Sequence, residues 1–342
     1  MIRIGFVNRI VGHITGTFQW EHQLDYGLDA FFIGRLARTE DEYQIPVLAS
    51  SVWIQQTYAP PYLGKLRLPA GYRTSAVYSR KAFRNVMLYV ETPFLNPPTL
   101  GNYTQLYVGL ENGASGSDLL SYVFTPGPRL YVFAIHKPHI FNIDVTGIYP
   151  PDGNRHAFKI WHGRYFTAFI IDNKPVAFAV KTGLGELISS SAPYAVVSLP
   201  NLPEALTTIL ELHTDRTDNT DVEIDVPSPF WFRILEGYEV HTMNLPLHPQ
   251  NSSTPLAGSA ISTNTTSHPF PMVPGRTRLI WRSSGSGTLT LQVFGRGFAT
   301  AGSVSYSAGV EYYIELPPAT LGRVIVNPSA SQTIHRAEVV IV

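Results

Sequence analysis

The chain has 342 residues, with 25 Lys and Arg balanced by 25 Asp and Glu, and no cysteine. The balanced charge gives no reason to expect a nucleic-acid partner, and the absence of cysteine excludes disulfides, thiolate metal sites and cysteine nucleophiles. Only 15% of the residues are charged, whereas 44% are hydrophobic and 12% aromatic, which is typical of an all-β protein with frequent turns. The N-terminus lacks the apolar core of a secretory signal, and no stretch is long enough for a membrane span. We therefore expect a soluble chain without its own export signal.

Residues 1–71 contain few regular patterns. Ile2, Ile4 and Phe6 alternate, which indicates an opening strand. The prolines of Tyr58-Ala-Pro-Pro-Tyr62 exclude the middle of a regular element there. We interpret this segment either as an aromatic arm that docks on a neighbouring subunit or as accessory strands of the following domain.

From residue 72 to residue 241 the sequence predicts a dense series of strands in one domain. Turn residues such as Asn112-Gly113 and Pro126-Gly127-Pro128 separate these strands. Their number and spacing favour a large antiparallel sandwich. One segment, Asn201–Glu211, could instead form a helix with Pro203 in its first turn. The predicted strands are Ala82–Glu91, Thr104–Glu111, Leu119–Phe124, Arg129–His136, His139–Val145, His156–Trp161, Tyr165–Ile171, Val176–Val180, Tyr194–Ser198, Thr208–Leu212, Thr220–Val226 and Trp231–Tyr238.

The clearest fold signal runs from His156 to Lys181. It consists of three strand-like runs joined by two short turns, His162-Gly-Arg164 and Asp172-Asn-Lys-Pro175. The stretches Gln105-Leu-Tyr-Val-Gly-Leu110, Asp152-Gly-Asn-Arg-His-Ala-Phe-Lys-Ile-Trp161 and Tyr165-Phe-Thr-Ala-Phe-Ile-Ile-Asp-Asn-Lys-Pro-Val-Ala177 accompany this signal.

These stretches resemble the concanavalin A-like lectin and glucanase superfamily, and within it the laminin-G-like branch. The resemblance covers about residues 72–240 and implies a jelly roll. It specifies function poorly, because the superfamily includes lectins, glycosidases, adhesion modules and virion parts. Asn173 stands where the family most often has glycine, but asparagine tolerates the same left-handed turn.

Two further segments complete the expected architecture. Residues 242–275 are rich in Ser, Thr, Asn and Pro, which predicts an extended linker. Residues 276–342 predict a second, small β-sandwich. Its five expected strands are Thr277–Arg282, Thr288–Phe294, Val310–Leu316, Arg323–Val326 and Arg336–Val342. The whole chain is thus expected to be all-β, with a large concanavalin A-like jelly-roll sandwich followed by a small β-sandwich domain.

The segment Glu223-Ile-Asp225-Val-Pro-Ser228 is the main candidate for catalysis. It resembles the Glu-x-Asp-x-x-Glu strand of retaining glucanases in this superfamily, in which alternate carboxylates share one face. Here Ser228 replaces the third acid and Pro227 interrupts the strand. We therefore interpret Glu223 and Asp225 as solvent-facing strand residues, and we predict no catalytic residues and no cofactor.

The metal-binding potential of the chain is left open. Asp215, Asp218 and Asp221 could supply oxygen ligands to calcium, but a polar turn between strands explains them equally well. Four histidines, His136, His139, His156 and His162, lie around the central strands, yet they do not assemble the ligand set of a zinc site. Arg296, between two glycines, is interpreted as part of a turn.

Three functions fit these features. The leading one is a non-enzymatic structural or attachment protein of a virus particle, assembled in the host cytoplasm through contacts with itself or with other virion subunits. The alternatives are a carbohydrate-binding protein of the cell surface that recognises surface glycans, and a glycosidase. Exposed aromatic residues could stack on sugars or anchor an interface. The large candidates are Trp20, Trp53, Tyr58, Tyr62, Trp161, Trp231 and Trp281.

Overall fold

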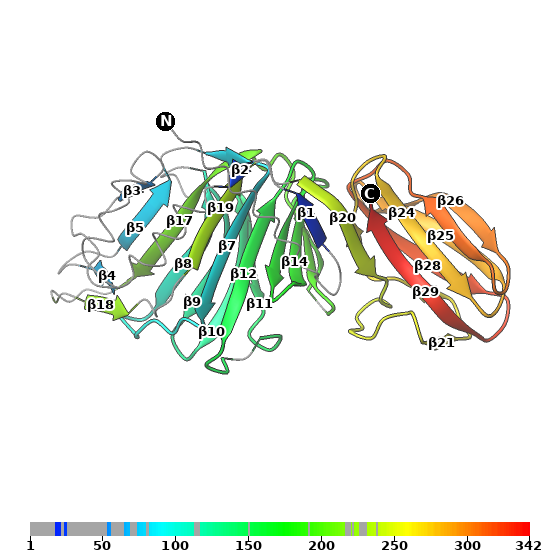
Figure 1. Cartoon of the computed structure of the whole chain (residues 1–342), viewed down its shortest axis with the longest axis horizontal. Helices are drawn as coiled ribbons and strands as arrows, with labels where there is room; N and C mark the ends of the chain where they lie inside the picture. The colour runs from blue at the N-terminus through cyan, green and yellow to red at the C-terminus, as the bar shows by residue number, and fades with distance from the viewer. Residues whose placement is uncertain are drawn as a thin grey trace, which may run out of the picture.

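The computed structural model describes residues 82–112, 117–149, 151–190, 192–215, 220 and 243–342, together with the backbone of several further strands. Those strands lie at residues 18–21, 24–25, 53–55, 65–68, 74–79, 222–225, 231–236 and 239–242. The described residues form strands joined by turns and loops, in two bodies that lie side by side (Figure 1). No helix in this part of the chain is long and apolar enough to cross a membrane.

One large sheet, called sheet I here, contains the stretch around which the sequence is organised. Strand β12 pairs antiparallel with β13, which pairs antiparallel with β14, as the two short turns predict. Asp172 and Asn173 adopt positive φ angles of 45° and 71° in the second turn, so Asn173 takes the left-handed conformation expected of it. In spatial order sheet I contains β15 (Leu187–Ser189), β16 (Ala195–Ser198), β14 (Lys174–Val180), β13 (Phe166–Ile171), β12 (Arg155–His162), β7 (Val86–Pro93), β19 (Trp231–Glu236) and β2 (Leu24–Asp25).

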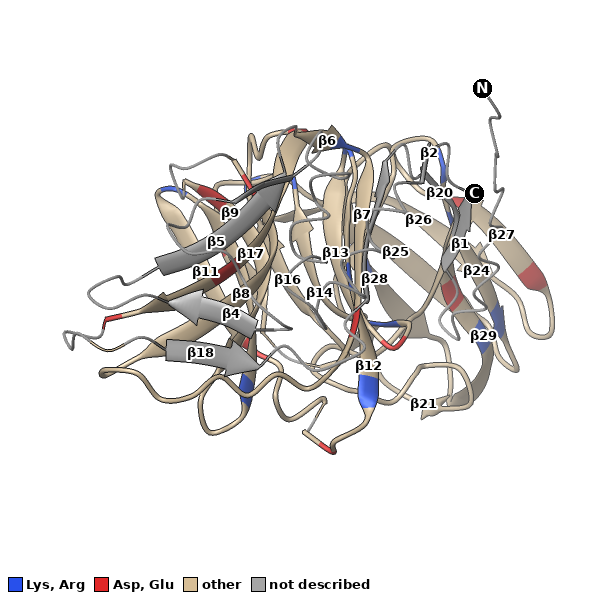
Figure 2. Cartoon of the chain, turned by 60° about the vertical axis from the view of Figure 1, so that its left-hand side comes forward, with Lys and Arg blue, Asp and Glu red and all other residues tan. Residues whose placement is uncertain are grey.

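The second large sheet, sheet II, packs against sheet I (Figure 2). Alternate residues of its strands, such as Leu106 and Val108 on one strand and Tyr122 on the next, point towards sheet I and are almost fully buried. They meet residues such as Phe158 and Phe169 of sheet I in one continuous core. In spatial order sheet II contains β11 (His139–Asp144), β10 (Arg129–His136), β9 (Asp118–Thr125), β8 (Thr104–Glu111), β17 (Ala205–Thr214), β5 (Thr74–Ser79) and β3 (Trp53–Gln55), with β6 (Phe83–Arg84) paired to β17.

Two stacked, mainly antiparallel sheets with a shared apolar core confirm the predicted all-β sandwich. The helix considered for Asn201–Glu211 is wrong, because β17 occupies this segment and pairs with β8. Its buried residues alternate, with Leu206, Leu210 and Leu212 facing the core. That period of two is the pattern of a strand and not of a helix.

The second body is the small β-sandwich. Its first sheet contains β1 (Phe18–Glu21), β20 (Glu239–Pro246), β29 (Gln332–Ile341), β24 (Thr277–Ser283) and β27 (Glu311–Glu315), with β21 (Ala260–Ile261) paired to β29. Its second sheet contains β22 (Thr265–Thr266), β28 (Leu321–Pro328), β25 (Gly287–Phe294) and β26 (Phe298–Tyr306), with β23 (Phe270–Pro271) paired to β28. The strand β26 is absent from the sequence prediction, because its small and polar residues give little hydrophobic alternation.

The structure differs from the predicted linker at residues 242–275. Strand β20 pairs with β29, and β21, β22 and β23 add short pairings. Leu247, Leu256 and Phe270 of this segment are almost fully buried in the small sandwich. Ser and Pro dominate the composition, but the isolated apolar residues between them pack as the wall of the sandwich. This segment therefore belongs to the second domain.

The first 71 residues contribute the short strands β1, β2, β3 and β4 (Lys65–Leu68). Among these, β2 extends sheet I, β3 extends sheet II and β1 extends the small sandwich. These pairings correspond to the accessory-strand alternative for residues 1–71. The remainder of this segment, including the alternating Ile2, Ile4 and Phe6, lies outside the described residues.

The two sandwiches are joined by a shared apolar cluster. Phe166, Phe178 and Val196 point out of sheet I, away from the jelly-roll core, and belong to the same buried cluster as Phe294 and Phe270 of the small sandwich. A hydrogen bond of 2.8 Å joins the His268 ring to the carbonyl of Tyr194. Because a buried apolar seam resists relative motion, we expect the two bodies to behave as one unit.

Candidate functional site

The outer face of sheet II is the best candidate for a functional surface in the described part of the chain. The small sandwich covers part of the outer face of sheet I, through Trp161, Phe166 and Phe178. The outer face of sheet II carries mixed polar and aromatic residues, of which Ser121, Val123 and Ile209 are almost fully buried. We define the outer face of sheet II by the side chains of Gln105, Tyr107, Glu111, Ser121, Val123, Tyr131, Phe133, Ile209, Glu211 and His213, which alternate with core residues.

Two glutamates, Glu111 and Glu211, lie on neighbouring strands of this face and differ in burial. Glu111 ends β8 and is only 8% exposed. Its burial, together with the negative charge of Glu211, raises the pKa of Glu111 to about 7. The side chain of Glu211 on β17 is 20% exposed. The Glu111 carboxyl group is therefore able to carry a proton near neutral pH.

The floor between these two acids contains aromatic rings and a glycine. Tyr107 is the direct cross-strand partner of Glu211, and its ring meets Phe133 edge to face at a centroid distance of 5.9 Å. The pair of rings bridges β9, which lies between their strands. Gly109, two residues before Glu111, adds no side chain to this face. The result is a pair of aromatic rings beside Glu211 and a buried glycine between the two acids.

His213 extends the site beyond Glu211. Its Nδ1 lies 3.4 Å from a carboxylate oxygen of Glu211, and its Nε2 lies 3.1 Å from the hydroxyl of Tyr103. The Tyr103 and His213 rings are 5.7 Å apart, and Tyr103 remains 44% exposed. His213 therefore fixes the position of Glu211, while Tyr103 offers an exposed aromatic surface at the end of the site.

Sequence reasoning missed Glu111 and Glu211. Glu111 stands before Asn112-Gly113 and reads as the polar end of a strand, and Glu211 falls in the segment that was also interpreted as a helix. The alternation of apolar residues with Gln105, Tyr107 and Glu111 is the signal that places them on one face. Their proximity depends on the pairing of β8 with β17, which are separated by about a hundred residues in the sequence.

The predicted carboxylates Glu223 and Asp225 lie elsewhere. They belong to β18 (Val222–Asp225), which pairs with β4 in a two-stranded sheet apart from sheets I and II. Their cross-strand partners are Arg67 and Lys65. Ser228 lies outside the described residues.

Among the predicted calcium ligands, the structure describes Asp215 only. Its Oδ1 accepts hydrogen bonds from the backbone N–H groups of Asn102 and Tyr103, at 2.7 and 2.9 Å. These bonds lower the pKa of Asp215 and close the loop before β8. Asp218 and Asp221 lie outside the described residues, and calcium binding there stays a prediction. Within the described residues, no three His, Asp or Glu side chains converge as a metal site would require.

The four candidate histidines have separate environments. His136 contacts Asp118, His139 lies against Gly185, and His156 contacts Asp152 and Asp172. His162 is fully buried, with its Nδ1 2.8 Å from the Thr167 hydroxyl and its Nε2 2.8 Å from the Pro203 carbonyl. Burial and the neighbouring Lys181 lower the pKa of His162 to about 3, so it is neutral under ordinary conditions.

The remaining candidates that the structure describes lie in the core or in a turn. Trp161 and Trp281 are buried. Arg296 lies in the turn that joins β25 to β26, where Gly297 has a φ of 152°. The side chains of Trp20, Trp53 and Trp231, and residues Tyr58 and Tyr62, lie outside the described part.

Comparisons with known proteins give likeness in structure only. No protein-family model and no curated protein matches the sequence. A similar solved structure is the catalytic domain of an endo-1,3-β-glucanase (laminarinase) from Thermotoga petrophila, with 10% identity, a TM-score of 0.39 and coverage of 66% of this chain and all of that domain. Others are β-agarase B from Zobellia galactanivorans (12% identity, TM-score 0.35, coverage 65% and 95%) and a Bacillus licheniformis β-glucanase (8% identity, TM-score 0.34, coverage 55% and 93%).

The prediction of a non-enzymatic virion subunit is corrected at this point. The solved structures found to be similar are glucanases, an agarase and a transglycosylase. These similar structures are named as enzymes and none as a virion subunit, so the virion interpretation is not carried further, and an enzymatic role for this chain is a proposal. The sequence prediction put glycosidase last because Glu223-Ile-Asp225 lacks the third acid of the glucanase strand, with Ser228 in its place and Pro227 interrupting the strand.

Proposed function

We propose that the protein is a glycoside hydrolase whose catalytic face is the outer face of sheet II. The observation that carries the proposal is the raised pKa of Glu111, about 7, caused by burial and by the charge of Glu211. A carboxyl group that keeps its proton near neutral pH, with a second carboxyl group on the next strand, is the kind of pair that acid-assisted cleavage of a glycosidic bond uses.

Each glutamate has a distinct role in this proposal. Protonated Glu111 donates its proton to the glycosidic oxygen as the bond to the leaving sugar breaks. Glu211, as a carboxylate, accepts a proton from the water that attacks the anomeric carbon. His213, 3.4 Å from Glu211, orients that carboxylate. Tyr107 and Phe133 supply the aromatic surface on which a sugar ring stacks.

The strand register sets the separation of the two glutamates along the face. Tyr107 pairs directly with Glu211, and Glu111 lies four residues further along β8. The two glutamates are thus separated by roughly 13 Å along the strands, at ~3.3 Å per residue. This backbone separation exceeds the spacing of the carboxyl groups both in inverting enzymes, ~6.5–9.5 Å, and in retaining enzymes, ~5–5.5 Å. The two side chains would have to lean towards each other to act on one bond, and the register alone assigns neither stereochemical outcome.

The test incubates the protein with a panel of soluble polysaccharides that includes β-1,3-glucan, mixed-linkage β-glucan and agarose. Hydrolysis is measured by the release of reducing ends. We expect at least one polymer to be cleaved, and the variants Glu111→Gln and Glu211→Gln to lose about 100-fold or more of the rate. The control is Glu315→Gln, whose side chain is 80% exposed on the small sandwich. Cleavage that survives both site variants would overturn the proposal, as would the absence of cleavage on every polymer.

A second candidate function is carbohydrate binding without cleavage. The exposed ring of Tyr103 and the Tyr107–Phe133 pair favour it, because aromatic faces stack on sugars whether or not a bond is broken. Binding of an uncleaved polymer that is lost in Tyr103→Ala and Tyr107→Ala would select this candidate over hydrolysis.

A further inference from the structure

A hollow between the two sandwiches has the chemistry of a second ligand site. Its volume is about 400 Å³, within the ~300–1,000 Å³ typical of small-molecule pockets, which often form at domain interfaces. Six residues line it: Leu187, Ile188, Ser189, Ser190, Gln250 and Asn251. The first four come from β15 and the residue that follows it in the jelly roll, whereas Gln250 and Asn251 come from the loop after β20.

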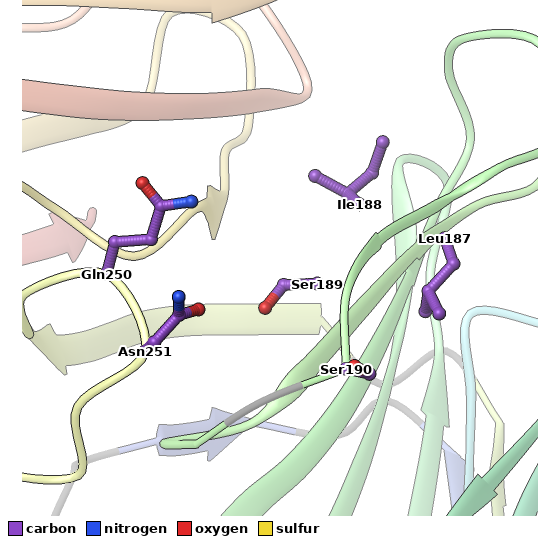
Figure 3. Close-up of a pocket in the computed structure, with 6 residues that line it drawn as sticks. All are labelled: Leu187, Ile188, Ser189, Ser190, Gln250 and Asn251. Atoms are coloured by element: carbon purple, nitrogen blue, oxygen red, sulfur yellow. The ribbon is translucent and has the colours of Figure 1, made fainter.

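Figure 3 shows how the two walls face each other. The side chain of Ser189 is directed across the hollow, towards the loop that carries Gln250 and Asn251. The pairing of β15 with β16 shifts register between Leu187 and Ser189. Such an irregularity re-aims side chains at the edge of a sheet. This local feature accounts for the presentation of consecutive side chains to the hollow.

The opposite wall is held by backbone hydrogen bonds. The N–H of Gln250 donates to the carbonyl of Thr266 at 2.8 Å, and the N–H of Ser252 donates to the carbonyl of Pro249 at 3.1 Å. Asn251 has a φ of 63° in this turn, a left-handed conformation that asparagine adopts more readily than most residues. The amides of Gln250 and Asn251 therefore project from a defined turn.

The two walls are tied together close to the hollow. The His268 ring meets Tyr194 edge to face at a centroid distance of 4.9 Å and hydrogen-bonds its carbonyl. Burial, with a smaller effect of His248, lowers the pKa of His268 to about 4. At neutral pH its Nε2 is then the N–H that donates to the Tyr194 carbonyl, because a carbonyl only accepts. This contact joins the two bodies that carry the walls of the hollow.

The lining contains no charged side chain. Its two amides provide both donors and acceptors, its two hydroxyls can do either, and its two aliphatic side chains offer apolar contact. An ionic ligand would lose its hydration there without gaining a counter-charge. A neutral saccharide matches the set, because its hydroxyl groups pair with amides and its C–H faces pack on leucine and isoleucine.

We propose that this hollow binds a neutral sugar unit, as a second carbohydrate site distinct from the outer face of sheet II. In part the inference rests on the proposed function, since a polysaccharide substrate would supply such units. A chain bound at this site would be held by the protein independently of the reacting bond. The expected consequence is a higher affinity for long polymers than for short oligosaccharides.

The experiment measures binding by isothermal titration calorimetry in a Glu111→Gln/Glu211→Gln background, which prevents consumption of the ligand. The probes are neutral hexasaccharides of β-1,3-glucan, β-1,4-glucan and agarose, with a hexasaccharide of uronic acids as the charged comparison. We expect a neutral hexasaccharide to bind and the charged one not to bind. Gln250→Ala combined with Asn251→Gly should weaken that binding about tenfold or more. Glycine is chosen at residue 251 because it keeps the left-handed turn.

Two matched controls accompany these variants. Asn264→Ala removes an exposed amide of the same domain, and Asn201→Gly replaces another asparagine with positive φ, 61°, outside the hollow. Both should bind as the parent does. Unchanged affinity in the Gln250 and Asn251 variant, or equal binding of the charged hexasaccharide, would overturn the inference.

The outcomes separate this inference from the proposed hydrolysis. Binding that depends on Gln250 and Asn251 in a protein that cleaves no polymer would support the hollow and reject the hydrolase. Cleavage that depends on Glu111 in a protein whose hollow variants bind normally would support the hydrolase and reject the hollow.

Discussion

The ring of His156 is hydrogen-bonded to the carboxylate of Asp172, which links the first residues of β12 to the turn after β13. The other ring nitrogen lies 3.0 Å from Asp152, and the second oxygen of Asp172 accepts the backbone N–H of Ala157 at 2.8 Å. The histidine of the central sequence stretch thus bridges two acidic turns at one end of sheet I. Partial burial alone would lower the pKa of His156, but the hydrogen bonds to the two aspartates outweigh it and raise the pKa above 6.5.

This bridge predicts a pH-dependent stability. Because the folded state binds the His156 proton more tightly than the unfolded state, the added stability is complete below pH 6.5 and is lost as the pH rises through the folded pKa. The difference in unfolding free energy between the native protein and His156→Asn should therefore shrink between pH 6 and pH 8.5, by at most about 1.4 kcal/mol per pH unit. Urea unfolding at several pH values measures it. His335→Asn, an exposed histidine, is the control, and a difference that stays constant over this range would contradict the prediction.

The tight packing around Gly109 predicts that a side chain at this position destabilises the fold. A Cβ at this position would lie 2.5 Å from the Cβ of Ser121 and would also press on the carbonyl of Leu120. Gly109→Ala should therefore force β8 and β9 apart and destabilise the fold by about 1–3 kcal/mol. The matched control is Gly302→Ala, also within a strand, where a Cβ meets nothing within 4 Å. Chemical denaturation of both variants gives the comparison, and equal stabilities would show that the close approach of β8 and β9 is not required.

The shared cluster between the sandwiches predicts a single unfolding transition. Phe178 is fully buried between Phe166 and Tyr194, on the face of sheet I that meets the small sandwich. Phe178→Ala should cost about 3–5 kcal/mol and lower the midpoint of the whole transition in differential scanning calorimetry. Gly183 supports the same junction, because a Cβ there would lie 2.8 Å from the ring of Phe294. Two separate transitions, only one of them moved by Phe178→Ala, would mean that the sandwiches unfold independently.

Local patterns in the sequence predicted the jelly roll well, because its signals lie close together in the chain. The run from His156 to Lys181 contains its turn residues and its alternation in a single segment, and β12, β13 and β14 form there. The strand β17 was harder to assign, because Leu206 and Leu210 also fit a helical spacing and only pairing with β8 decides the matter. The prediction of a linker at residues 242–275 was wrong for a different reason. Their composition is that of a linker, yet burial of a few residues such as Leu256 and Phe270 holds them on the second domain.

The candidate site could not be predicted from the sequence, for a related reason. Glu111 and Glu211 are separated by about a hundred residues, and nothing local connects them. The raised pKa of Glu111 depends on burial within the assembled sheet and on a charge from another strand. Glu223 and Asp225, in contrast, attracted attention through a compact motif, although the strand that carries them pairs only with β4, in a two-stranded sheet.

Glu111 gives the sharpest test of the site, because its protonation can be followed without any substrate. With a pKa of about 7, the carboxyl should be observable by NMR of carbon-13-labelled glutamate as a group that titrates near neutral pH. Glu211→Gln removes the smaller of the two causes, so the pKa of Glu111 should fall but remain above 4.5, because burial still acts. If polymer cleavage is found, its rate should decline as the pH rises above about 7, since a general acid must be protonated. The control Glu315→Gln should leave the titration of Glu111 unchanged. A Glu111 carboxyl that titrates at 4.5 in the native protein would remove the basis for its role as the acid.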